Sequence, residues 1–249
     1  MAGHSKFKNI MHRKGAQDKK RAKIFSRLGR EISVAVKEGG PDPEKNIRLR
    51  SAIISAKSLN MPKDNIERAI KKGEGNDPDS NYEEVRYEGY GPDGVAIIVE
   101  ALTNNKNRTA AEVRSTFNKY GGNLGETGSV SFGFKRIGSI TLNKNNINEE
   151  ELFDFIVENG SDDYELNDNH YNIFCDQKTL HQLNQKIVEK FGPTDFTGLI
   201  WKSDNEITIS KEKADTLFKL LNVLEENEDV QAVSSNFDVS DDILDSLTA

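Results

Sequence analysis

The stretch Gln17–Pro41, QDKKRAKIFSRLGREISVAVKEGGP, predicts a long helix whose two sides differ in chemistry. Apolar residues recur in it at helical spacing, and so do basic residues. The apolar set is Ile24, Phe25, Leu28, Ile32 and Ala35, and the basic set is Lys20, Lys23, Arg27 and Arg30. At about 100° per residue, the two stripes are centred roughly 140° apart. We therefore expect one side to pack in a small bundle while the other side faces phosphates.

Two shorter helices are predicted after this one. The first helix is expected to end near Lys37, because Gly39-Gly40-Pro41 is a strong stop signal. A second helix is expected to start at Asp42 as N-cap and to reach Leu59. Met61-Pro62 breaks it, and a third helix is expected from about Asp64 to Gly73. Together they predict a basic three-helix domain over residues 1–76.

Charge is distributed very unevenly along the chain. Residues 1–72 hold nineteen Lys and Arg against seven Asp and Glu, a net charge of +12. Residues 73–249 hold fifteen against thirty-four, a net charge of −19, so the whole-chain value of −7 conceals a basic end. A charge run is usually only a solvated surface, but this density and contrast favour a polyanion partner. Nucleic acid is the leading class, because phosphates reward clustered Lys and Arg through counterion release.

The acidic part reads as αβ structure. After the turn-rich linker 73–80, strands are expected over 82–90 and 95–102 and a helix over 109–120, and an alternating strand through Val130, Phe132 and Phe134 follows. Residues 137–202 read as β-α-β-β-α-β, the ferredoxin-like order. Residues 206–209, 212–227 and 230–237 then read as β-α-β.

The predicted fold class is therefore α+β, with the three-helix basic domain followed by two ferredoxin-like αβ domains, one inserted in the other. The predicted domains are 1–76, a split domain of 80–135 plus 205–240, an inserted domain of 136–204, and an acidic tail of 241–249. One cysteine, Cys175, excludes an intramolecular disulfide and suits a reducing compartment. No stretch approaches about eighteen apolar residues. We therefore expect a cytoplasmic protein with no membrane span.

Nothing in the sequence indicates an active site, so we predict no enzyme activity and no metal or other cofactor. His170 and His181 lie near Cys175 but share no ligand motif with it, and a buried core cysteine is the better interpretation. The loop Gly122–Gly128, GNLGETG, follows a helix and lacks a closing Gly-Lys-Ser/Thr, so a connector is favoured over a phosphate loop. Phe132 and its neighbours suit core packing better than base stacking.

Several long motifs resemble the YebC/PmpR family. They are GHSKFKNI (3–10), NMPKDNIERAI (60–70), YEGYGP (87–92), Asn107-Arg108-Thr109 and GNLGxxGSV (122–130). Phe7 stands where the family usually has Trp, Asn104 where it often has Asp, and Asp93 where Gly is frequent. The resemblance implies a helical domain and two αβ domains around a central cleft, and a non-enzymatic role. Family members are generally described as DNA-binding transcriptional regulators, and some relatives as ribosome-associated activators of translation.

We therefore predict a nucleic-acid-binding regulator of gene expression, by resemblance a DNA-binding transcriptional regulator. The alternative is a translational activator that binds ribosomal RNA and the ribosome. A third class, a protein adaptor that uses the acidic part, needs no nucleic acid. The residues expected to contact nucleic acid are His4, Lys6, Phe7, Lys8, Arg13, Lys14, Lys19, Lys20, Lys23, Arg27 and Arg30. No helix carries an evident set of Arg, Asn and Gln readers of base edges, which leaves DNA and RNA both open.

Overall fold

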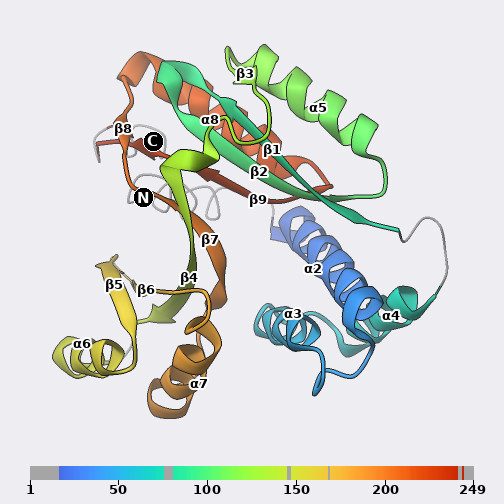
Figure 1. Cartoon of the computed structure of the whole chain (residues 1–249), viewed down its shortest axis with the longest axis vertical. Coiled ribbons are helices and arrows are strands. Elements are labelled where there is room, and N and C mark those ends of the chain that lie inside the picture. Colours follow the sequence, from blue (N-terminus) through green and yellow to red (C-terminus); the bar gives the residue numbers. More distant parts are fainter. Residues whose placement is uncertain (1–16, 76–80, 145–146, 168, 241–242, 244–249) are drawn as a thin grey trace. The chain divides into compact units, whose positions relative to one another are not determined.

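The computed structural model describes residues 17–75, 81–144, 147–167, 169–240 and 243 (Figure 1). The chain divides into two compact units, one of residues 1–135 and 203–249 and the other of residues 136–202. Among the described residues three helices come first, and the αβ structure that follows is built on antiparallel sheets. The predicted α+β class is confirmed.

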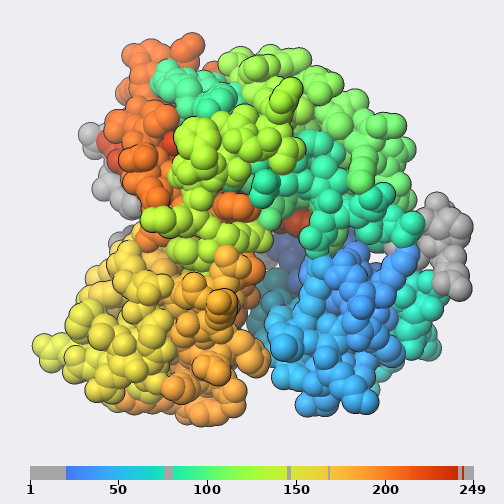
Figure 2. All heavy atoms as spheres, viewed as in Figure 1, coloured from blue at the N-terminus to red at the C-terminus, as the bar shows by residue number. Residues whose placement is uncertain are grey.

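The helical domain consists of α2 (Gln17–Gly39), α3 (Ile47–Ser58) and α4 (Lys63–Glu74). Its core contains Ile32 and Ala35 from α2, Leu49 from α3 and Ile66 from α4. These residues recur at helical spacing, so each helix buries one stripe against the other two. Figure 2 shows the side chains of α2 and α3, in blue, as one closely packed body.

The start of α3 differs from the prediction, because Asn46 is its N-cap instead of Asp42. The Asn46 side-chain oxygen accepts the Leu49 N–H at 3.0 Å, and its amide nitrogen donates to the Ala35 carbonyl at 2.6 Å. Asp42 instead begins a turn, in which the Asp42 carbonyl accepts the Asn46 N–H at 2.9 Å. Asn46 is buried, so it joins α3 to α2 as well as capping it.

The first sheet has the strand order β3-β1-β2-β9. Its strands are β1 (Glu83–Tyr90), β2 (Ala96–Thr103), β3 (Asn123–Leu124) and β9 (Val230–Ser235). Helices α5 (Lys106–Lys119) and α8 (Lys211–Glu226) pack on it and on each other around Phe117, Leu217 and Leu221. The tight connection η2 (Pro92–Gly94) pairs β1 directly with β2, which gives an order different from the ferredoxin-like one.

Two short strands, β8 (Ile207–Thr208) and β10 (Phe237–Asp238), form a separate parallel pair.

The prediction of a strand through Val130, Phe132 and Phe134 is wrong for the first part of that stretch. The 3-10 turn η3 (Ser131–Gly133) replaces it, and the strand begins only at Phe134. The reason is the Glu88 carboxylate, which accepts the N–H groups of Val130 at 3.0 Å and Ser131 at 2.9 Å and so removes them from strand pairing.

The second unit is a four-stranded sheet with the order β5-β6-β4-β7. Its elements are β4 (Phe134–Asn143), α6 (Glu149–Glu158), β5 (Ser161–Leu166), β6 (His170–Cys175), α7 (Leu180–Phe191) and β7 (Phe196–Ser203). The β-α-β-β-α-β sequence and this strand order are ferredoxin-like, as predicted. Ile140, Leu152, Ile173 and Leu183 fill its core.

Candidate nucleic-acid interface

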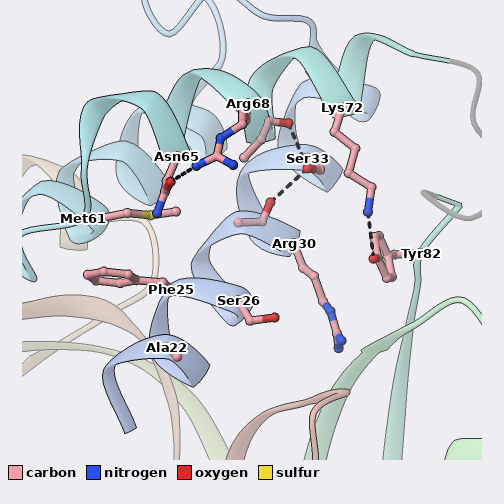
Figure 3. A pocket seen from close by; sticks show the side chains of 12 residues that line it. Ala22, Phe25, Ser26, Arg30, Ser33, Met61, Asn65, Arg68, Lys72 and Tyr82 are labelled. Carbon is pink, nitrogen blue, oxygen red and sulfur yellow. Dashed lines mark hydrogen bonds between the residues drawn. The ribbon is translucent and has the colours of Figure 1, made fainter. Parts of the chain in front are cut away.

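A groove of about 450 Å³ lies between α2 and α4 (Figure 3). Twelve residues line it: Ala22, Phe25, Ser26, Gly29, Arg30, Ser33, Met61, Asn65, Arg68, Ala69, Lys72 and Tyr82. In the described part of the chain, none of these lining residues is acidic, whereas three of them are cationic. A groove of this composition attracts anions, although the whole chain is acidic.

Close packing of the two helices forms the floor of the groove. The Ser33 hydroxyl lies 2.9 Å from the Gly29 carbonyl and 2.8 Å from the Ala69 carbonyl and shares its one proton between them, so it bridges α2 and α4. A side chain at Gly73 would meet the Ser33 carbonyl at 2.5 Å, so glycine is needed for this approach. The small residues Gly29 and Ala69 leave the space above the contact open.

Arg68 and Lys72 lie one helical turn apart on α4 and extend over the groove (Figure 3). Both are exposed. The Arg68 guanidinium donates to the Asn65 side-chain oxygen and to the Asp64 carbonyl. Among the residues that the structure describes, neither Arg68 nor Lys72 pairs with a carboxylate, so both charges are available to an external anion.

Tyr82 closes one end of the groove and is held by cations. The Lys72 ammonium donates to the Tyr82 hydroxyl at 3.3 Å and lies 5.4 Å from the centre of its ring. The Arg30 guanidinium lies 5.5 Å from the same ring. These cation–π contacts bring two cations to this end of the groove, of which Arg30 is also paired with the Asp229 carboxylate at 2.9 Å.

The structure can place only three of the predicted contact residues by their side chains. His4, Lys6, Phe7, Lys8, Arg13 and Lys14 lie outside the described residues, and Lys19 and Lys20 belong to α2 without described side chains. Lys23, Arg27 and Arg30 lie on the side of α2 that meets the connection between α8 and β9. A role for these eleven residues in binding nucleic acid stays a prediction.

Arg27 and Arg30 do not form the open basic stripe that the helical spacing suggested. Arg27 donates to the Glu225 carbonyl, and Arg30 donates to the Glu228 carbonyl at 2.5 Å and the Asp229 carboxylate at 2.9 Å. Burial, the largest influence, lowers the pKa of Arg27 and also that of Lys23, where the neighbouring Arg27 charge adds to it. Of the two arginines, only Arg30 also reaches the groove.

Asp229 is a buried junction that binds four side chains. Besides Arg30, its carboxylate accepts from Arg108 at 2.7 Å, Thr109 at 2.7 Å and Thr103 at 3.1 Å. Burial, the largest influence, favours the protonated form, but the bonds from Arg108 and Thr109 and the charges of Arg108 and Arg30 outweigh it and lower the Asp229 pKa. The junction therefore joins β2, α5 and β9 to helix α2.

Sequence reasoning missed Arg68, Lys72 and Tyr82 as members of a basic site. A signal for the first two was present, because an Arg and a Lys four residues apart lie on the same side of a helix. Tyr82 had no such signal, since it follows the linker and its position beside α4 depends on the fold.

Comparison with known proteins identifies the family. Residues 5–76 match a model described as the TACO1/YebC protein N-terminal domain, and residues 82–237 match one described as the TACO1/YebC second and third domain. The chain belongs to the TACO1/YebC family. The resemblance drawn from the motifs is thereby confirmed. The model that matches residues 82–237 is named for a transcriptional regulator.

A solved structure supports the same membership in the TACO1/YebC family. The chain is 44% identical to the conserved hypothetical protein Aq1575 from Aquifex aeolicus, whose crystal structure it matches with a TM-score of 0.84. The match covers 90% of this chain and 93% of that chain. It extends the likeness to the three-dimensional fold.

Four of the five motifs of the TACO1/YebC resemblance fall at three structural positions, and the fifth, at 3–10, lies outside the described residues. The stretch 60–70 forms the turn before α4 and one wall of the groove. Asn107-Arg108-Thr109 starts α5 and binds Asp229. The stretches 87–92 and 122–130 meet at Glu88, which holds the glycine-rich loop through the N–H groups of Val130 and Ser131.

The other candidate groups do not form a site. No group of three or more His, Cys, Asp and Glu able to hold a metal occurs in the described residues. Cys175 is fully buried, and burial raises its pKa to about 11, as expected for an unreactive core thiol. Of the Val130, Phe132 and Phe134 set, the first and third are core residues, whereas Phe132 is 83% exposed. No described helix is long and apolar enough to cross a bilayer.

Proposed function

We propose that this protein is a non-enzymatic regulator of gene expression that binds nucleic acid through the α2–α4 groove and the basic residues before it. The observation that carries the proposal is the groove itself, where Arg68 and Lys72 have no carboxylate partner among the described residues and Arg30, which is also paired with Asp229, lies beside them. Phosphate groups suit this arrangement, since Arg and Lys side chains from two helices can contact them together.

Transcription is the first candidate process, in keeping with the name of the family model. The target is then duplex DNA, contacted mainly through phosphates. Translation is the second candidate, and one observation favours it: residues 73–249 carry a net charge of −19. A free DNA-binding protein gains little from so acidic a body, whereas in a crowded ribosomal site like-charge repulsion restricts binding to one orientation.

A binding titration with matched charge reversals tests the proposal. Arg68→Glu with Lys72→Glu removes two cations from the groove. The matched control is Lys211→Glu with Lys213→Glu, which makes the same charge change at exposed positions in the first turn of α8. We expect the groove variant to bind a 20-base-pair duplex or a structured RNA roughly tenfold more weakly, with a log–log salt slope shallower by about 2. The control should stay within about threefold of the unmodified protein.

Equal affinity and equal salt slope in the folded groove variant would remove the groove from the proposed function. Absence of any salt-dependent binding to DNA or RNA by the unmodified protein would leave the adaptor class standing instead. Crosslinking in intact cells separates the two processes. Sites concentrated at promoters indicate transcription, and sites concentrated on ribosomal RNA indicate translation.

A further inference from the structure

We propose that the α2–α4 groove receives one unstacked nucleotide of a nucleic-acid chain, with the base at its Phe25–Met61 end and the phosphate at its Arg30–Lys72 end. This inference rests on the proposed function and narrows its target. The preferred partner is then a strand with an unpaired residue, such as a bulge or a loop, in preference to a continuous duplex.

The size of the groove exceeds what phosphate contact alone requires. Its volume of about 450 Å³ lies within the range of about 300–1,000 Å³ that small-molecule sites in proteins span. A basic surface that only follows a phosphate backbone needs no hollow. A hollow of this size in a cationic surface therefore fits a ligand that has a base and a sugar beside its phosphate.

The two ends of the groove differ in polarity (Figure 3). Ala22, Phe25 and Met61 line one end, and Arg30, Lys72 and Tyr82 line the other. Phe25 is only partly buried, and the Arg21 guanidinium lies 5.5 Å from the centre of its ring, so a base would stack on the part of the ring that Arg21 leaves open. A nucleotide has the same division, because its base has an apolar face and its phosphate is an anion. Aromatic side chains that stack on unpaired bases are typical of RNA recognition.

Polar groups border the apolar end, with Asn65 beside Met61, and the edge of a base would fall there (Figure 3). The Asn65 side-chain oxygen is occupied by Arg68, which leaves the Asn65 amide group to donate to a ligand. Ser26 is exposed and adds a hydroxyl that can donate or accept. By contrast, the one Ser33 hydroxyl proton is already shared between two backbone carbonyls at the helix contact.

A continuous duplex cannot use the apolar end. Its bases are stacked and paired inside the helix, so a protein reaches only their edges in the grooves. A base must leave the stack to enter a pocket, and the free-energy cost of this is lowest where it is already unpaired. The groove therefore selects for unpaired nucleotides, while the surrounding cations bind any nucleic acid.

Three RNA probes of the same sequence test this selection. The first is a fully paired 20-base-pair duplex, the second carries one bulged uridine, and the third carries an abasic residue at the bulge. The abasic probe keeps the bulge phosphate and its flexibility but lacks the base. We expect the full-length protein to bind the uridine bulge about tenfold more tightly than either other probe, in line with the value of stacking one base.

A variant that fills the groove provides the matched control. Ala22→Phe keeps every cation but occupies the apolar end, and Ser26→Phe does the same from the next turn of α2. Either variant should bind all three probes within about twofold of one another while keeping the salt dependence of duplex binding. Circular dichroism of both variants verifies the fold, and two independent positions keep the test valid if one fails to fold.

A positional readout comes from replacing the bulged uridine by 4-thiouridine. Irradiation should crosslink it to the peptides that contain Phe25 or Met61. Equal binding of the three probes by the unmodified protein, or crosslinks only outside the groove, would overturn the inference while leaving charge-driven binding intact. Displacement of the bulged probe by micromolar uridine monophosphate would also overturn it, since the groove would then be a site for a free nucleotide. Absence of binding to any probe would defeat the inference and the proposed function together.

Discussion

The groove and the first sheet hold their charges in opposite ways. In the sheet, Glu88 and Asp229 are only 1% and 3% exposed, and both carboxylates accept several hydrogen bonds. In the groove, Arg68 and Lys72 are exposed and, among the described residues, have no carboxylate partner. The sheet thus contains carboxylates whose partners are part of the fold, whereas the groove contains cations whose anions must come from outside.

This difference separates structural charges from binding charges. A buried ion whose partner is removed destabilises the fold, because the remaining charge is left without compensation. An exposed cation contributes little to stability, and removing it affects chiefly what the protein binds. Stability and binding measurements on matched variants can therefore test this distinction between the two kinds of charge.

The largest expected effect is on Asp229. Asp229→Ala leaves Arg108, Thr109 and Arg30 without their shared acceptor, and we expect the free energy of unfolding to fall by about 3 kcal/mol. Urea denaturation followed by circular dichroism measures this. The matched control is Glu228→Ala, because the neighbouring Glu228 side chain is 86% exposed. That change should cost no more than about 0.5 kcal/mol, and equal losses in the two variants would contradict the assignment of Asp229 as a structural charge.

A pH dependence follows from the same carboxylates. Arg108 and Thr109 lower the Asp229 pKa in the folded protein against burial, and the N–H groups of Val130, Gly128 and Ser131 do the same for Glu88. Unfolded carboxyls titrate near pH 4. The stabilisation is therefore complete above that pH and is lost as the pH falls through the lower folded-state values.

We expect the unmodified protein to lose at least about 1 kcal/mol more than the Asp229→Asn variant between pH 5 and pH 3. Urea titrations at pH 7, 5, 4 and 3 provide the comparison. Glu228→Gln should follow the curve of the unmodified protein. Parallel curves for Asp229→Asn and the unmodified protein would show that Asp229 does not contribute in this window.

The helices and the class of fold could be predicted because their causes are local. The spacing of Ile24, Leu28 and Ile32 repeats every turn, and glycine ends α2. The N-cap residue of α3 could not be predicted in this way, because Asp42 and Asn46 both suit an N-cap. The hydrogen bond from Asn46 to the Ala35 carbonyl depends on how α3 packs against α2. The predicted N-cap was therefore wrong because a tertiary contact determines where α3 begins.

The candidate site was predictable in charge but not in position. The composition of residues 1–72 indicated a basic region, and the spacing of Arg68 and Lys72 was readable from the sequence. The partners of Arg27 and Arg30 lie 198 or more residues away along the chain, at the end of α8 and in the connection from α8 to β9. No local pattern in α2 could show that a distant carboxylate and two distant carbonyls would occupy these guanidinium groups.

Arg30 takes part in both the groove and the Asp229 junction, so its replacement should have an intermediate effect on stability. It pairs with Asp229 and also lines the groove. Arg30→Met should lower the free energy of unfolding by about 1–2 kcal/mol and weaken nucleic-acid binding severalfold. A double-mutant cycle with Asp229→Asn should yield a coupling energy of about 1 kcal/mol. Additive effects in this cycle would mean that the pair contributes nothing in solution.

The smallest expected effect on stability is in the groove. Arg68→Gln with Lys72→Gln removes two charges and leaves shorter, uncharged polar side chains on the exposed side of α4. We expect the free energy of unfolding to change by no more than about 0.5 kcal/mol, because in the described residues these cations have no buried partner to leave behind. The same variant should bind duplex or structured RNA several times more weakly and with a shallower salt slope. Thermal denaturation and a binding titration on one preparation give both values. A large loss of stability without loss of binding would reverse the comparison, since the groove cations would then be structural charges like Asp229.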